Sequence, residues 1–99
     1  MGAPRLRLAW VDARGVLQAV EVTAKLRIGR APECELPLDE DGVSRVHCEI
    51  RPAGEGLALI DARSTNGTFV NGTRVQTAQL ASGDRIQIGR VELVAVRDN

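Results

Sequence analysis

The sequence predicts an all-β fold, a sandwich of short strands, and three observations support this prediction. Ten Gly and four Pro divide the 99 residues into short pieces. Between these breaks, apolar residues recur at every second position over segments of about four to seven residues, which is typical of strands with one buried face. The composition, 43% hydrophobic and 26% charged, is that of a folded domain with room for one core.

The expected strands can be placed in order along the chain. Apolar residues alternate in these groups: Leu6, Leu8 and Trp10; Leu26 and Ile28; Leu36 and Leu38; Val46, Cys48 and Ile50; Leu57 and Leu59; Ile86 and Ile88; and the run from Val91 to Val96. Residues 16–24 also carry apolar side chains at helical spacing, but β-branched residues and the alternation of Val20 and Val22 favour a strand. Asn71-Gly72 predicts a tight hairpin turn between two further short strands.

Charge and aromatic content exclude several classes of binding protein. The 13 basic and 13 acidic residues balance, so no overall positive charge favours nucleic acid. Trp10 and Phe69 are too few for a proline-peptide groove, a methyl-lysine cage or a base-stacking platform. No apolar run approaches the ~18 residues of a membrane span, and the N-terminus lacks the apolar stretch of a signal peptide. We expect an aliphatic core, no nucleic-acid binding and no membrane insertion.

Catalytic patterns are incomplete in this sequence. Ser44, His47 and Asp61 have the residue types of a triad, but a Ser and a His three apart at a strand start are expected to point to different faces. No oxyanion-hole motif accompanies them. The run Asp39-Glu40-Asp41 lacks the spacing of a calcium loop and is expected to form a solvated turn. We therefore expect neither enzymatic activity nor a cofactor.

The two cysteines are expected to be reduced, which suits a cytoplasmic location. Cys48 lies in an apolar alternation and is expected in the core, whereas Cys34 lies in a polar turn and could be exposed. A disulfide between them is left open. With one His in the chain, these thiols are too few for a structural zinc site, so no metal is predicted.

Polar residues gather in the segments between the expected strands, where a rigid scaffold commonly presents function. Arg30, Ser44, Thr65 and Asn66 offer a guanidinium, two hydroxyls and a carboxamide. Almost all of these groups are donors, which suits an oxyanion such as a phosphate monoester. The carboxamide of Asn66 both donates and accepts, so it could pair with a peptide backbone.

Each of these residues also has a purely structural interpretation. Gly29 could permit a bulge, Arg30 could be a surface charge, and Ser44 could close a turn. His47, beside the apolar Cys48, is expected to make a structural hydrogen bond. Asn66 followed by Gly is first a turn signal. The order and spacing of the whole set favour the functional interpretation.

That set resembles the forkhead-associated (FHA) domain family. The resemblance runs from about Leu26 to Val96 and rests on these motifs: Gly29-Arg30, Ser44-Arg45-x-His47, Ser64-Thr65-Asn66-Gly67-Thr68, Asn71-Gly72 and Gly83-Asp84-x-Ile86-x-Ile88-Gly89. It implies a sandwich of two sheets with about eleven strands and a phosphothreonine-peptide site in loops at one end.

The resemblance also implies roles for individual residues. Arg30, Ser44 and Thr65 would hold the phosphate, Asn66 would grip the peptide main chain, and Arg45 would line the site. Three further residues would shape the loops: Gly29, His47 and Gly67.

We therefore expect a phosphothreonine-dependent docking module whose partner is a protein phosphorylated by a Ser/Thr kinase. The module is expected to be cytoplasmic and monomeric, with residues 1–99 forming one domain, and its place as the N-terminal module of a longer protein is left open. Two alternatives remain: a phosphate-independent interaction domain, and a regulatory domain of a larger enzyme. The acidic run 39–41 precedes Ser44, so we expect it beside the peptide path, where it would disfavour acidic peptides.

Overall fold

Eleven strands make up the computed structural model, which describes residues 5–98. The strands are β1 (Arg5–Val11), β2 (Leu17–Glu21), β3 (Leu26–Gly29), β4 (Leu36–Pro37), β5 (Cys48–Ala53), β6 (Gly56–Asp61), β7 (Thr68–Val70), β8 (Thr73–Val75), β9 (Thr77–Leu80), β10 (Arg85–Ile88) and β11 (Val91–Asp98). These residues contain no helix, and therefore none that could cross a membrane. The all-β prediction is confirmed, including a strand rather than a helix within residues 16–24.

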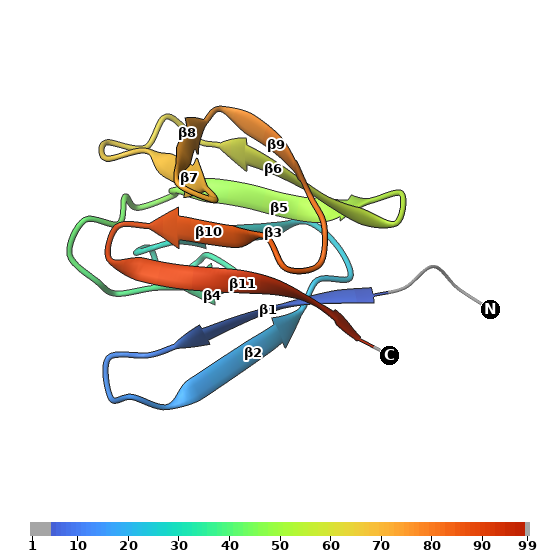
Figure 1. Cartoon of the computed structure of the whole chain (residues 1–99). Coiled ribbons are helices and arrows are strands. Elements are labelled where there is room, and N and C mark those ends of the chain that lie inside the picture. The colour runs from blue at the N-terminus through green and yellow to red at the C-terminus, as the bar shows by residue number, and fades with distance from the viewer. Residues whose placement is uncertain (1–4, 99) are drawn as a thin grey trace.

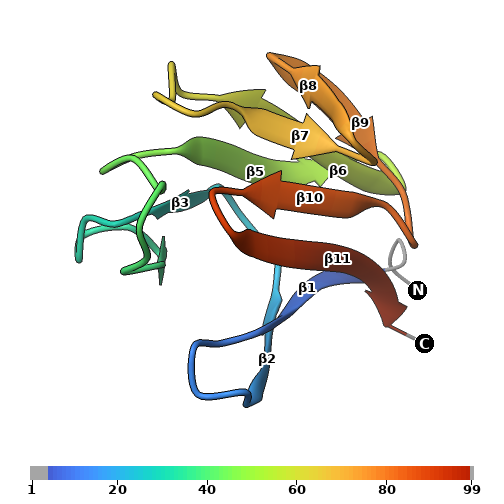
Figure 2. The same ribbon diagram turned by 60° about the vertical axis from the view of Figure 1, so that its left-hand side comes forward.

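The strands form two layers, which Figures 1 and 2 show from two directions. One sheet has the order β2-β1-β11-β10-β7-β8 and the other the order β4-β3-β5-β6-β9. All pairs are antiparallel except β3 with β4. The predicted hairpin turn joins β7 to β8, and its two residues, Asn71 (φ 50°) and Gly72 (φ 86°), adopt the left-handed conformation of a type I′ turn.

The core between the sheets is aliphatic, as the sequence predicts. Alternate residues of most strands point inward, and the following aliphatic side chains have at most 2% of their surface exposed: Leu6, Leu8, Ile28, Ile50, Leu57, Leu59, Leu80, Ile86, Ile88 and Leu93. Each such side chain contributes about 1.5–3 kcal/mol by leaving water. Trp10 is only partly buried and packs against the edge of this cluster.

Two expectations about the chain before β5 are wrong. The strand begins at Cys48, so Val46 is not part of the buried alternation and is 38% exposed. Cys34 is buried, not exposed, because the loop after β3 folds against residues 44–46 and its thiol donates to the Arg45 carbonyl (3.4 Å). Cys34 and Cys48 are both free thiols, so no disulfide joins them.

Candidate functional site

Loops from both sheets meet at one end of the sandwich, on the left of Figure 1. They connect β3 to β4, β4 to β5, β6 to β7 and β10 to β11. Backbone hydrogen bonds fasten the first two loops together: the Arg30 N–H donates to the Ser44 carbonyl (2.9 Å) and the Ala31 N–H to the Arg45 carbonyl (3.0 Å). This pairing places Arg30 and Ser44, which are distant in sequence, side by side.

Gly29 makes this close approach possible. A Cβ at position 29 would lie 2.1 Å from the carbonyl oxygen of Arg45 and 2.8 Å from the Cα of Val46, both of them backbone atoms. Any side chain would therefore push the two loops apart. Gly29 is required here by the contact itself.

His47 joins the β4–β5 loop to the β6–β7 loop. Its ring is fully buried; Nδ1 accepts a hydrogen bond from the Ser44 N–H (3.1 Å), and Nε2 lies 2.9 Å from the Gly67 carbonyl. A carbonyl can only accept, so the neutral ring carries its hydrogen on Nε2. The ring reaches no solvent and is placed to hold loops, not to touch a ligand.

The structure contains no catalytic triad of Ser44, His47 and Asp61, although it does connect Ser44 to His47. Residues 45–46 form a bend and β5 begins only at Cys48, so the His47 ring can turn back and accept from the Ser44 amide. The Ser44 hydroxyl instead accepts from the Thr65 N–H (3.0 Å). The Asp61 carboxylate accepts hydrogen bonds from Ser64 and Thr68.

Asp61 organises the β6–β7 loop, a role that the sequence analysis missed. Its carboxylate accepts from the Ser64 N–H (3.1 Å), the Ser64 hydroxyl (2.5 Å) and the Thr68 hydroxyl (2.6 Å), and Ser64 Oγ accepts from the Gly67 N–H (3.1 Å). Burial raises the pKa of Asp61, but the hydrogen bonds from Ser64 and Thr68 outweigh burial and hold the pKa below its usual value. In the sequence, the three-residue spacing from Asp61 to Ser64 could have indicated a turn closed by the aspartate side chain.

A depression of about 250 Å³ opens between these loops, lined by Arg30, Gly42, Val43, Ser44, Arg45, Thr65 and Asn66. No carboxylate is among them. Within residues 5–98, the Arg30 guanidinium and the Thr65 hydroxyl have no hydrogen-bond partner, and the Ser44 hydroxyl keeps its hydrogen to donate. The structure thus brings together the predicted phosphate ligands around a space that presents donors.

Two other predicted residues lie at the margins of this depression. The exposed Arg45 guanidinium lies 3.9 Å from the Glu33 carboxylate, a loose surface ion pair. Asn66 Nδ2 donates to the carbonyl of Gly42 (3.1 Å), a contact that sequence reasoning did not foresee. Gly67, with φ 89°, supplies the left-handed residue that turns the loop after Asn66.

A second depression of about 300 Å³ continues from Asn66 and is lined by Asp41, Gly42, Asn66, Gly89 and Arg90. Of the acidic run 39–41, only Asp41 borders it; Asp39 and Glu40 line a separate groove. No three His, Cys, Asp or Glu side chains lie together as a metal site in the described part of the chain.

A two-sheet β-sandwich with a depression between its end loops is the architecture of a ligand-binding domain. The family model named FHA domain matches residues 26–89, which include Arg30, Ser44, Thr65 and Asn66. This chain belongs to the FHA domain family.

Known relatives share the fold and much of the sequence. The FHA domain-containing protein FhaA of Mycobacterium tuberculosis is 48% identical over 67 residues, 68% of this chain and 13% of that protein. The glycogen accumulation regulator GarA of Mycolicibacterium smegmatis is 46% identical over 66 residues, 67% of this chain and 42% of that protein. The chain thus spans less than half the length of both relatives.

The fold also matches solved FHA domains. One, described in a structural and functional analysis of phosphothreonine-dependent FHA domain interactions, superposes with a TM-score of 0.83 at 37% sequence identity, covering 96% of this chain and 98% of that one.

Proposed function

We propose that this domain is a phosphothreonine-dependent docking module: it binds a protein after a Ser/Thr kinase has phosphorylated it, and it has no catalytic activity of its own. One observation carries the proposal. Arg30, whose guanidinium has no partner in the described chain, lines the same depression as the hydroxyl-bearing Ser44 and Thr65. Three donors around one space match the acceptor oxygens of a phosphate monoester.

The expected affinity follows from this donor set. Hydrogen bonds to a charged group contribute about 1.5–3 kcal/mol each, and Arg30 can supply two of them through its planar fork. Ordering the peptide and removing water from the phosphate oppose this gain. A net binding free energy of about −7 to −9 kcal/mol, that is, a dissociation constant near 1 μM, is the expected range.

We propose that Asn66 converts this anion site into a peptide site. Its Nδ2 donates to Gly42, which fixes the plane of the carboxamide, and its Oδ1 has no hydrogen-bond partner in residues 5–98. An acceptor held at the border between the two depressions is placed for a peptide N–H beside the phosphate. Arg45 lines the same depression and would approach the ligand from its margin.

The choice of threonine is supported by the family, since an FHA domain 37% identical to this chain was described in work on phosphothreonine-dependent interactions. We propose a monomeric domain over residues 1–99, with no affinity for nucleic acid because its charge is balanced. Two unpaired thiols suit the reducing cytoplasm.

The test is calorimetry with peptides selected from a degenerate phosphothreonine library. Each peptide is titrated in three forms, with phosphothreonine, with phosphoserine and with unmodified threonine, into the wild type, Arg30→Ala and the control Arg85→Ala. Arg85 is an exposed arginine at the far end of β10, so the control removes the same charge away from the site.

We expect binding of the phosphothreonine form alone. Arg30→Ala should weaken it by about 10- to 100-fold or more, because a charged hydrogen bond is lost, while Arg85→Ala changes little. Equal binding of phosphorylated and unmodified peptides, or a folded Arg30→Ala protein that binds the phosphothreonine peptide within about threefold of the wild type, would overturn the proposal.

A further inference from the structure

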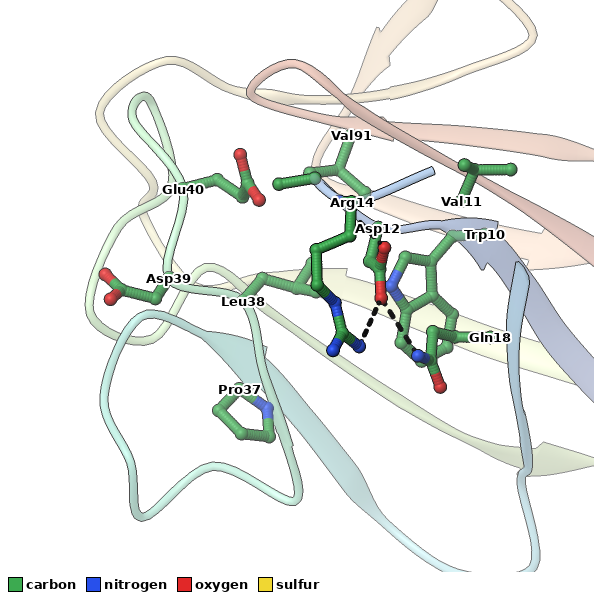
Figure 3. Close-up of a pocket in the computed structure, with 11 residues that line it drawn as sticks. Trp10, Val11, Asp12, Arg14, Gln18, Pro37, Leu38, Asp39, Glu40 and Val91 are labelled. Carbon is green, nitrogen blue, oxygen red and sulfur yellow. Dashed lines mark hydrogen bonds and ion pairs between the residues drawn. The ribbon is translucent and has the colours of Figure 1, made fainter. Parts of the chain in front are cut away.

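A groove of about 320 Å³ lies beside the candidate site and belongs to none of its motifs. It runs between the β1–β2 hairpin and the residues after β4, and it is lined by Trp10, Val11, Asp12, Ala13, Arg14, Gln18, Pro37, Leu38, Asp39, Glu40 and Val91 (Figure 3). We call it the Trp10 groove. Trp10 and Gln18 lie on one side of it, and Asp39 and Glu40 on the other.

The Trp10 groove combines apolar side chains with two unpaired carboxylates. Trp10, Val11 and Pro37 supply most of the exposed apolar surface, over the buried Leu38 and Val91. The carboxylates of Asp39 and Glu40 have no hydrogen-bond or ion-pair partner in the part of the chain that the structure describes. They are therefore available to a positively charged ligand.

The other two charged residues of the groove, Asp12 and Arg14, are already paired. The Asp12 carboxylate accepts from the Gln18 side chain (3.0 Å), the Val16 N–H (3.0 Å) and the Arg14 N–H and guanidinium (2.9 and 3.0 Å). These hydrogen bonds, that from Gln18 first, hold the pKa of Asp12 well below its usual range, so it stays ionised. The groove holds three carboxylates, those of Asp12, Asp39 and Glu40, and one guanidinium, that of Arg14. Its net charge at neutral pH is therefore about −2.

The Trp10 groove and the candidate peptide site are formed by neighbouring residues of the same two segments. Glu40 is followed by Asp41 and Gly42, which line the depression next to Asn66, and Val91 is preceded by Arg90, which lines it too. A ligand chain that leaves the phosphate site past Asn66 and crosses Gly42 would therefore come next to the residues of the Trp10 groove.

We propose that the Trp10 groove binds a lysine or arginine side chain of the same phosphorylated partner, at a position away from the phosphothreonine. This inference rests on the proposed phosphopeptide function. A cation would gain from the Trp10 indole and from the free carboxylates of Asp39 and Glu40, while its aliphatic stem would cover Pro37. The end of the domain thus carries a positive site for the phosphate and a negative groove for a basic residue. These opposite charges would favour one orientation of the partner's peptide across the domain.

The test uses phosphothreonine peptides free of Trp and Tyr, in which one lysine is moved through positions four to eight on either side of the phosphothreonine. Lysine-to-glutamine peptides of equal length and a short peptide without lysine are the references. Trp10 is the only tryptophan of the chain, so its fluorescence reports directly on the groove.

Affinities are measured by calorimetry for the wild type, Asp39→Asn/Glu40→Gln, Arg14→Gln and the control Glu55→Gln. Glu55 is exposed in the turn between β5 and β6, so its variant matches the loss of an acidic charge outside the groove. All substitutions are at groove or surface charges that the core does not use.

We expect one lysine position to improve binding about two- to tenfold over its glutamine reference and to change the Trp10 fluorescence. The improvement should vanish in Asp39→Asn/Glu40→Gln, grow in Arg14→Gln and persist in Glu55→Gln, while the short peptide binds all four proteins equally.

The inference falls if no lysine position improves binding, if the double variant keeps the improvement, or if Glu55→Gln loses it to the same extent. It also falls if sedimentation finds dimers of the wild type that dissociate only in the groove variants, because a second copy of the chain would then cover the groove. When the short phosphopeptide binds and lysine adds nothing, the proposed function survives alone; when no phosphopeptide binds, both fail.

Discussion

Replacing His47 with Ala should destabilise the domain and loosen two binding loops at once. The buried ring accepts from the Ser44 amide and donates to the Gly67 carbonyl. Without it, the buried Gly67 carbonyl loses its partner at a cost of about 1–3 kcal/mol, whereas water can reach the half-exposed Ser44. Truncating a large buried side chain adds about 2–5 kcal/mol. The total, roughly 3–8 kcal/mol, is comparable with the entire stability of a domain this size, about 5–15 kcal/mol.

Two variants separate hydrogen bonding from packing. His47→Ala should lower the melting temperature by at least ~12 °C, given a shift of about 4–8 °C per kcal/mol. His47→Phe fills most of the same volume but neither donates nor accepts, so it should recover only the cavity part of the loss. Both should weaken phosphopeptide binding, because the loops that carry Ser44 and Thr65 would then be joined only by the hydrogen bond from the Thr65 N–H to the Ser44 hydroxyl. The assays are thermal unfolding by circular dichroism, and calorimetry at a temperature where each variant is folded.

The outcomes that refute this reasoning differ for the two variants. A melting temperature of His47→Ala within about 4 °C of the wild type would mean that the two hydrogen bonds and the packing contribute less than ~1 kcal/mol. If binding were also abolished in that stable variant, His47 would have to be a ligand contact in spite of its burial. A His47→Phe protein that binds phosphopeptide as the wild type does would show that packing alone positions the loops.

The remaining predictions concern a close contact, a peptide grip and an exposed ion pair. Gly29→Ala should cost about 1–3 kcal/mol or more, because its Cβ meets the Arg45 backbone, and denaturant unfolding with no loss of stability would contradict this. Asn66→Ala should weaken phosphopeptide binding by about 10- to 100-fold but leave binding of free phosphate almost unchanged, and equal losses in calorimetry would mean that Asn66 only holds the loop. The side-chain hydrogen bond from Arg27 lowers the pKa of Glu35 from 4.5 to about 2, so the stability it provides is present above pH 4.5 and is lost as the pH falls towards 2. Glu35→Gln should therefore flatten the stability curve between pH 4.5 and 2, and an unchanged acid-unfolding profile would contradict the assignment.

Strand alternation could be predicted from the sequence because burial of one face imposes it residue by residue. Leu57 and Leu59, or Ile86 and Ile88, point into the core whatever their neighbours do. The turn at Asn71-Gly72 is equally local. The FHA motifs added the two-sheet arrangement and the expected site residues.

What the sequence could not reveal depends on contacts between distant loops. Cys34 looked exposed in a polar segment, but the loop that carries it packs against the Arg45 carbonyl across the gap left by Gly29. The role of Asp61 depends on the fold of the next seven residues, and the Trp10 groove depends on a hairpin at the start of the chain lying beside residues 37–40. Alternation patterns carry no information about such pairings.

The long ladder between β1 and β11 has a consequence for how the chain reaches its native state. The first and last strands pair from Arg5 opposite Asp98 to Trp10 opposite Leu93, in the middle of one sheet (Figure 2). Bringing β1 and β11 together closes a loop of nearly the whole described chain, which costs conformational entropy. Only the pairing of the two strands compensates this cost, so we expect folding over milliseconds to seconds rather than microseconds. During synthesis the sheet cannot close until β11 has left the ribosome, and until then β1 has only β2 to pair with. A nascent chain arrested before Val91 should therefore remain sensitive to protease, whereas a chain that includes β11 should become resistant.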